Sequence, residues 1–176
     1  MNDYFTNISG FELLDKRGQR KRTSHETGLE ELDLVTYGFP TGTITDLFGP
    51  NSSGKSQILF QTAVNISIKN NKVLFIDSSG NFRPERIVQL SKAKNHDSKL
   101  VLDKIYTYRC NSLDKQLETV PMIKEFIDKN RITCVMIDDL TRNFTEHKFE
   151  MKHFRKIENV LTNSKLKKMV QRDLSA

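Results

Sequence analysis

The chain has 176 residues, 28% of them charged and 36% hydrophobic, with a net charge of +6 from 28 Lys and Arg against 22 Asp and Glu. These proportions indicate one soluble globular domain, long enough to bury about 70% of its unfolded surface. Its apolar runs are too short for a membrane helix and its polar N-terminus has no signal-peptide core, so we expect a cytoplasmic protein with no membrane partner. The two cysteines, Cys110 and Cys134, are too few for a disulfide framework or a metal cluster.

Much of the positive charge lies in two segments, residues 16–22 and 148–172. Such a balance is compatible with a phosphate-bearing partner such as DNA. A lysine-rich solvated surface would explain it equally well, so charge alone does not decide between the two.

Apolar periodicity and turn residues divide the chain into alternating elements. We expect residues 1–26 to be a polar lead-in, with a short amphipathic helix at 10–16, and residues 27–176 to form the folded core. Strands are predicted at 42–48, 72–77, 105–108 and 132–137, helices at 28–35, 57–69, 83–90, 112–128 and from 149 onward, and a loop at 95–98. Continuous apolar runs are typical of parallel strands buried on both faces. The alternation predicts an α/β fold, a mostly parallel sheet flanked by helices.

A phosphate-binding loop motif, G-x-x-x-x-G-K-S, lies between the predicted strand at 42–48 and the predicted helix at 57–69. Its glycines let backbone N–H groups approach a phosphate, Lys55 brings a positive charge to the β and γ oxygens, and the Ser56 hydroxyl can coordinate Mg²⁺. A chance glycine-rich turn would need neither this Lys-Ser pair nor the strand–loop–helix context, so we predict nucleotide binding. The residues predicted to bind the nucleotide here are Gly49, Pro50, Asn51, Ser52, Ser53, Gly54, Lys55, Ser56 and Gln57.

A carboxylate follows the second buried strand, well downstream of the loop. A Mg²⁺ ion that bridges phosphates needs an anionic oxygen in its shell, and Asp138 at the end of the 132–137 strand fits that role. Buried strands often end in aspartate for structural reasons alone. Together with the loop, the pattern predicts a metal site formed by Ser56 and Asp138.

Four separated motifs resemble the RecA/RadA-type recombinase family. They are T-G-L-E-E-L-D at 27–33, G-K-S-Q at 54–57, F-I-D-S-S-G-N-F-R-P-E-R-I at 75–87 and V-M-I-D-D-L-T-R at 135–142. The resemblance implies a RecA-like P-loop NTPase core at residues 27–176, ATP and Mg²⁺ as cofactors, and a role in homologous recombination and DNA repair. It also implies single-stranded DNA and a recombinase or paralog subunit as partners. The chain is similar in particular to the short RadB-like paralogs.

Two positions depart from the family pattern. Ser79 stands where the family has a glutamate that polarises the attacking water, and losing a general base typically costs about 10²–10⁴-fold in rate. Asp139 stands where the family usually has serine, and we hypothesise that it takes over the base role, so that Lys55 and Asp139 are the candidate catalytic residues. The alternative is that Asp139 caps the turn or supports Mg²⁺ indirectly.

The third departure is length. Only 38 residues follow Asp138 (176 minus 138), so we expect the family's later strands, with their γ-phosphate sensor and DNA-contacting loops, to be missing or severely reduced. The chain is then a short paralog, a fragment or a degenerate subunit.

Three other polar residues are candidates for a place near the nucleotide. Arg83 or Arg86 is placed by the resemblance near the nucleotide base, and we count Arg86 as a nucleotide-binding candidate. Surface pairing of these arginines with Glu85 is the alternative. For Gln116, we favour a solvated helix position over one that faces the nucleotide.

The sequence predicts an ATP-binding RecA-fold paralog that assists or regulates a recombinase, with weak or absent ATP hydrolysis. Two alternatives remain at this point. One is an active DNA-dependent ATPase that performs strand exchange, and the other is a RecA-like ATPase outside recombination.

Overall fold

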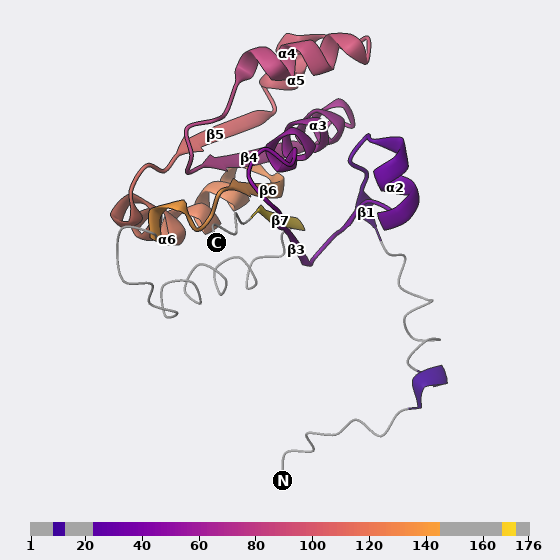
Figure 1. Cartoon of the computed structure of the whole chain (residues 1–176), viewed down its shortest axis with the longest axis horizontal. Helices are drawn as coiled ribbons and strands as arrows, with labels where there is room; N and C mark the ends of the chain where they lie inside the picture. Colours follow the sequence, from indigo (N-terminus) through magenta and orange to yellow (C-terminus); the bar gives the residue numbers. More distant parts are fainter. Residues whose placement is uncertain (1–8, 13–22, 145–166, 172–176) are drawn as a thin grey trace.

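The computed structural model describes residues 9–12, 23–144 and 167–171 (Figure 1). Its centre is a five-stranded sheet in the order β3-β7-β6-β4-β5, in which every neighbouring pair is parallel. The strands are β3 (Ile44–Leu47), β4 (Lys72–Asp77), β5 (Ile105–Arg109), β6 (Ile132–Asp138) and β7 (Lys167–Gln171). A separate antiparallel pair joins β1 (Ser24–His25) to β2 (Phe39–Pro40). The predicted α/β fold with a parallel sheet is confirmed.

Helices cover both faces of this sheet. They include α3 (Lys55–Ile68), α4 (Pro84–Ala93), α5 (Ser98–Leu102) and α6 (Leu113–Asn130). The helix α2 (Glu30–Thr36) lies beside β1 instead (Figure 1), and a 3-10 turn spans Arg142–Phe144. Figure 1 shows α3 and α6 on opposite sides of the sheet. None of the helices in the described ranges is long and apolar enough to cross a membrane.

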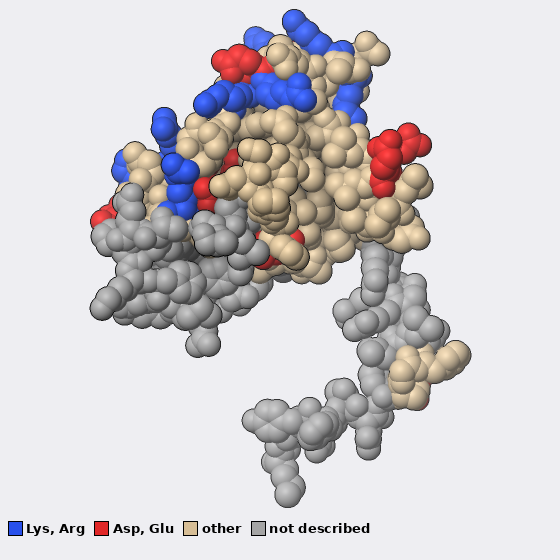
Figure 2. Space-filling view, in the orientation of Figure 1, with Lys and Arg blue, Asp and Glu red and all other residues tan. Residues whose placement is uncertain are grey.

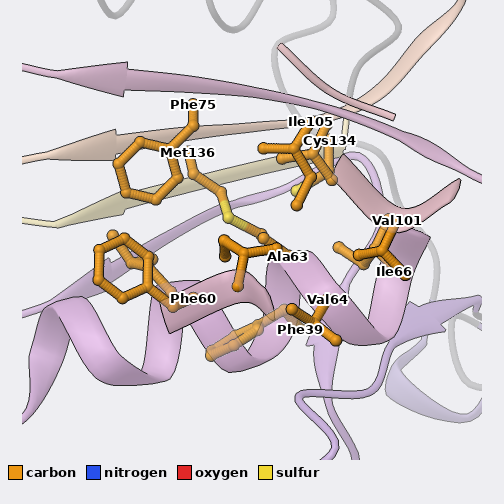
Figure 3. Close-up of a cluster of buried hydrophobic side chains, with 13 residues drawn as sticks. Phe39, Phe60, Ala63, Val64, Ile66, Phe75, Val101, Ile105, Cys134 and Met136 are labelled. Carbon is orange, nitrogen blue, oxygen red and sulfur yellow. The ribbon is translucent and has the colours of Figure 1, made fainter. Parts of the chain in front are cut away.

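The core consists of two apolar layers, one on each face of the sheet. On one face, side chains of α3 meet β4 and β6, and Phe60 lies opposite Phe75 with ring centroids 5.5 Å apart (Figure 3). On the other face, Ile123 and Ile127 of α6 pack on the alternate residues of the same strands. Alternate residues of the apolar strands β4 and β6 therefore pack into opposite layers. Cys134 is buried in the first layer, as expected for a small hydrophobic side chain.

The C-terminal part of the described chain differs from prediction. We expected helix from residue 149 onward and few or no strands after Asp138. Residues 145–166 lie outside the described residues, but residues 167–171 form β7, which lies between β3 and β6. This strand was missed because its sequence, K-K-M-V-Q, has only two apolar residues and no strand periodicity of its own.

Smaller differences lie at element ends. The predicted loop at 95–98 gives way to α5 from Ser98, whose cap is Asp97 accepting from Lys99 N at 2.8 Å. Of the helix expected at 10–16, residues 10–12 are helical and the rest lie outside the described residues. The boundary between residues 26 and 27 stays a prediction.

The aromatic contact at the centre of the first layer yields a stability prediction. Phe75 is fully buried and touches both Phe60 and Phe82. Phe75→Ala should lower the free energy of unfolding by about 3–5 kcal/mol, because it removes apolar contacts and leaves a cavity. Urea unfolding followed by circular dichroism measures this. Phe11→Ala is the control, since Phe11 is 79% exposed and should change little; equal losses in the two variants would contradict the assignment of the core.

Candidate nucleotide-binding site

The predicted phosphate loop connects β3 to α3, as the motif requires. Gly54 is the residue that caps α3, and its φ of 93° is one that side-chain-bearing residues rarely adopt. A Cβ added there would meet no atom within 4 Å, so the space above the loop is open. The first N–H groups of α3 have no partner within the helix, and a helix N-terminus beside open space is the geometry of an anion site.

Lys55 is turned back into the loop. Its side chain is 7% exposed, and Nζ donates to Gly49 O at 3.0 Å and to Pro50 O at 2.9 Å. Gly49 and Pro50 therefore contribute carbonyl groups that position the ammonium. A phosphate oxygen in the hollow would compete for the same donor.

Ser56 and Asp138 meet although 82 residues separate them. Ser56 lies in the first turn of α3 and Asp138 is the last residue of β6, and Ser56 Oγ donates to Asp138 Oδ1 at 3.0 Å. Hydroxyl and carboxylate oxygens are ligands that Mg²⁺ prefers, and the ion usually completes its shell with phosphate and water. No group of three or more His, Cys, Asp or Glu suited to a metal occurs in the described ranges. The pair thus fits a Mg²⁺ that arrives with a nucleotide.

These residues border a hollow of about 450 Å³, a size within the range of ligand pockets. Its lining residues are Asn51, Ser52, Ser53, Gly54, Lys55, Ser56, Gln57, Asn81, Asp139 and Arg142. Arg86 is not among them; its Nε donates to Gln57 Oε1 at 3.0 Å. It therefore lies one residue away from the hollow.

The segment after β4 is organised by a buried carboxylate. Asp77 accepts hydrogen bonds from the backbone N–H groups of Gly80, Asn81 and Phe82 at 2.7–3.1 Å, and from Ser79 Oγ at 3.2 Å. Such multiple bonding to one carboxylate holds a loop in a single conformation. Sequence reasoning missed this role, although an aspartate before a glycine-containing turn is a known signal for it.

The two arginines that follow make hydrogen bonds to neighbouring residues. Arg83 Nη1 donates to Gly80 O at 2.9 Å and to Phe82 O at 3.1 Å, so it holds the same loop. No salt bridge from Arg83 or Arg86 to Glu85 is found in the part of the chain that the structure describes. A position of Arg83 or Arg86 near the nucleotide base stays a prediction.

Asp139 borders the nucleotide hollow in an unusual backbone conformation. Its φ is 61°, a left-handed value that aspartate tolerates better than most residues. Its Oδ2 lies 3.8 Å from Arg142 Nη1, and both residues line the hollow. Sequence reasoning did not single out Arg142.

A buried amide network supports the turn that carries these two residues. Gln116 is 5% exposed; its Nε2 donates to Leu140 O at 3.1 Å and its Oε1 accepts from Asn143 Nδ2 at 3.0 Å. Asn143 Nδ2 also donates to Cys110 O. Our expectation of a solvated Gln116 is therefore wrong, because α6 turns this residue inward against the turn after β6.

Burial raises the pKa of the Cys110 thiol to about 11, with a smaller opposing effect from Lys115, so the thiol stays protonated at neutral pH.

The T-G-L-E-E-L-D motif has a structural role at a distance from the phosphate loop. Asp33 accepts from Thr27 N, Thr27 Oγ1 and Gly28 N at 2.7–2.9 Å. Gly28 O in turn accepts from Gln61 Nε2 of α3. The motif therefore anchors the segment before α2 to the helix that begins at the phosphate loop.

Fold and site together define an α/β domain of the P-loop class. The sequence model of the Rad51 family matches residues 19–169, which is most of the chain. The chain belongs to the Rad51 family, and the resemblance to RecA/RadA-type recombinases is confirmed.

Individual relatives agree with this membership. The chain is 36% identical over 154 residues to the DNA repair and recombination protein RadA of Methanococcus maripaludis strain C6, covering 77% of this chain and 47% of that protein, with the same values for strain C5. It is 32% identical over 142 residues to RadA of Ignicoccus hospitalis, covering 74% and 43%. The chain thus spans about half the length of the curated relatives it matches.

The loop held by Asp77 yields a prediction. Asp77→Ala should lower the free energy of unfolding by about 2–4 kcal/mol, because several buried donors lose a charged acceptor at once. Asp77→Asn is the matched control, since it keeps one acceptor oxygen and the same volume, and it should lose less. Urea unfolding compares the two; an Asp77→Ala protein as stable as the unmodified chain would refute the organising role.

Proposed function

We propose that this chain is an ATP-binding, Rad51-family subunit that assists or regulates homologous recombination and DNA repair, with weak or absent ATP hydrolysis. The observation that carries the proposal is the Ser56–Asp138 hydrogen bond at 3.0 Å beside the open phosphate loop. It brings a metal-binding hydroxyl and carboxylate to the place where the loop would hold a triphosphate. The recombination role rests on family membership and on what the RadA relatives are named for.

ATP binding is assigned to the residues of the loop. The N–H groups of residues 51–56 and the Lys55 ammonium would hold the phosphates, and Ser56 with Asp138 would hold Mg²⁺, which neutralises phosphate charge. Gln57 and Asn81 line the same hollow and give it further polar contacts. Arg86 supports this wall through its bond to Gln57.

Weak hydrolysis follows from what Ser79 can do. A serine hydroxyl does not accept a proton from water as a carboxylate does. In this structure its Oγ already donates to Asp77 Oδ1 at 3.2 Å. The side chain is therefore used to hold the loop, and bound ATP would act mainly as a conformational ligand.

A partner subunit is supported by one edge of the sheet. β5 is the outermost strand beside β4, and its outer side pairs with no other described strand. An apolar hollow of about 170 Å³ lies next to it, bordered by Tyr108, Met122 and Phe126, which are 39%, 67% and 37% exposed. Unpaired strand edges beside exposed apolar side chains favour docking of another chain, and we assign this place to a recombinase or paralog subunit.

Single-stranded DNA is the other proposed partner. Figure 2 shows lysine and arginine side chains gathered over the α4–α5 end, with acidic side chains beside them and a further acidic group on α2. Clustered lysine and arginine side chains attract a phosphate backbone.

An active ATPase is the second candidate function, and one observation favours it. Asp139 lines the hollow and carries a carboxylate within it. It is in a position to accept a proton there if it replaces the missing glutamate.

Nucleotide binding is testable by calorimetry. We expect ATP with Mg²⁺ to bind the intact chain, and Lys55→Ala to weaken binding by about tenfold or more, because a charge-assisted contact is lost. Ser56→Ala should remove the gain in affinity that Mg²⁺ brings and leave binding in EDTA unchanged. Lys124→Gln is the charge-matched control on exposed α6 surface. If the folded protein does not bind ATP, the proposal is contradicted.

Turnover separates the two candidate functions. We expect phosphate release near background with and without single-stranded DNA, and a gain of about a hundredfold or more in Ser79→Glu if a base is all that is missing. Asp139→Asn should leave the background rate unchanged. Brisk, DNA-stimulated hydrolysis that Asp139→Asn abolishes would instead establish the active ATPase.

A further inference from the structure

A second polar hollow opens beside the nucleotide hollow, where β4 and β5 end and α6 begins. Its volume is about 330 Å³. The residues that matter for its chemistry are Ser78, Gly80, Arg109, Ser112, Asp114 and Arg142. Arg142 is the residue that borders both hollows.

Ser78 supplies a buried hydroxyl. Ser78 directly follows the last residue of β4 and borders the hollow. Its side chain is 4% exposed, and its Oγ has no hydrogen-bond partner among the described residues. An unsatisfied buried hydroxyl is unfavourable, and a ligand oxygen in the hollow that its residue lines would satisfy it.

Arg109 supplies a positive charge on the neighbouring strand. A Cβ added to Gly80 would lie 2.8 Å from Arg109 Nη2, so the guanidinium occupies space that a larger residue at position 80 would fill. The φ of Gly80 is 74°, which also favours glycine there. Within the described ranges, we find no hydrogen bond or ion pair of the Arg109 guanidinium. The Arg109 side chain is exposed, so its five donors are available to a planar or tetrahedral oxyanion.

The N-terminus of α6 faces the same hollow. This helix has 18 residues, and Ser112 caps it by accepting from Lys115 N at 3.3 Å. The remaining N–H groups of the first turn have no partner within the helix and carry the positive end of its dipole. The lining of the hollow contains one carboxylate, that of Asp114, and two guanidinium groups, those of Arg109 and Arg142.

We propose that this second hollow is an oxyanion subsite that binds one phosphate group, held by Arg109, the Ser78 hydroxyl and the first turn of α6. Either a free phosphate ion or a backbone phosphate of DNA supplies this chemistry. The site is separate from the phosphate loop and its existence does not depend on ATP binding. Because Arg142 borders both hollows, an anion here lies next to the wall of the nucleotide site.

The first experiment titrates inorganic phosphate by calorimetry into Lys55→Ala protein, whose phosphate loop has lost its ammonium. We expect binding that Arg109→Gln, made in the same background, weakens by about tenfold or more. Lys124→Gln removes the same charge elsewhere on α6 and should leave it unchanged. Ser78→Ala should weaken binding severalfold while thermal stability stays equal or rises, since an unsatisfied hydroxyl is removed; a purely structural serine would lower stability instead.

The second experiment measures oligo-dT binding by anisotropy over a range of salt. If a backbone phosphate occupies the subsite, Arg109→Gln lowers the slope of log affinity against log salt by about 0.7, the value for one single-strand contact. Loss of phosphate binding with an unchanged slope assigns the subsite to the free ion. A changed slope, with or without altered phosphate binding, assigns it to DNA. If neither quantity responds to Arg109→Gln beyond the Lys124→Gln control, the proposal is overturned.

Discussion

Two buried carboxylates placed side by side are the constraint on which this edge of the molecule depends. Asp77 ends β4 and Asp138 ends β6, and the parallel register makes them direct Cα partners. They are 5% and 1% exposed. Buried carboxylates are tolerated only when donors surround them. Asp77 takes its donors from the loop at 79–82, and Asp138 takes the Ser56 hydroxyl, so burial of the pair draws both loops to one edge of the sheet.

That arrangement also favours a cation. Two adjacent carboxylates repel each other more strongly away from water, and a divalent ion beside Asp138 would relieve the repulsion while bridging phosphates. The stability of this edge is then linked to ligand binding, because a ligand that binds only the folded state stabilises it. If Ser56 and Asp138 hold Mg²⁺ as proposed, nucleotide binding and hydrolysis are separable, because hydrolysis also needs a general base and a serine hydroxyl such as that of Ser79 does not act as one.

Much of this architecture was predictable, for local reasons. The strands at 72–77 and 132–137 are continuous apolar runs, and the phosphate loop has a residue pattern with a direct mechanism. β7 was not predictable, because its two neighbours in the sheet, rather than its own sequence, place it there. The inward position of Gln116 depends on the packing of α6 against the turn after β6, and the shared position of Arg142 depends on that same turn. Such contacts join residues distant in the chain, which local patterns do not encode.

Arg142 lies beside Asp139 and borders both hollows, so it offers a route by which ligands in the two hollows would influence each other. The Arg142 guanidinium lies 3.8 Å from the Asp139 carboxylate. An anion that enters either hollow would compete with this carboxylate for the guanidinium. An oxyanion in the second hollow would attract Arg142 toward that hollow, and a triphosphate in the first hollow would attract it toward the first. Coupling of this kind is reciprocal, because the change that one ligand makes in the affinity of the other equals the converse change. If both proposed sites bind their ligands, the position of Arg142 would then depend on which phosphate groups are bound.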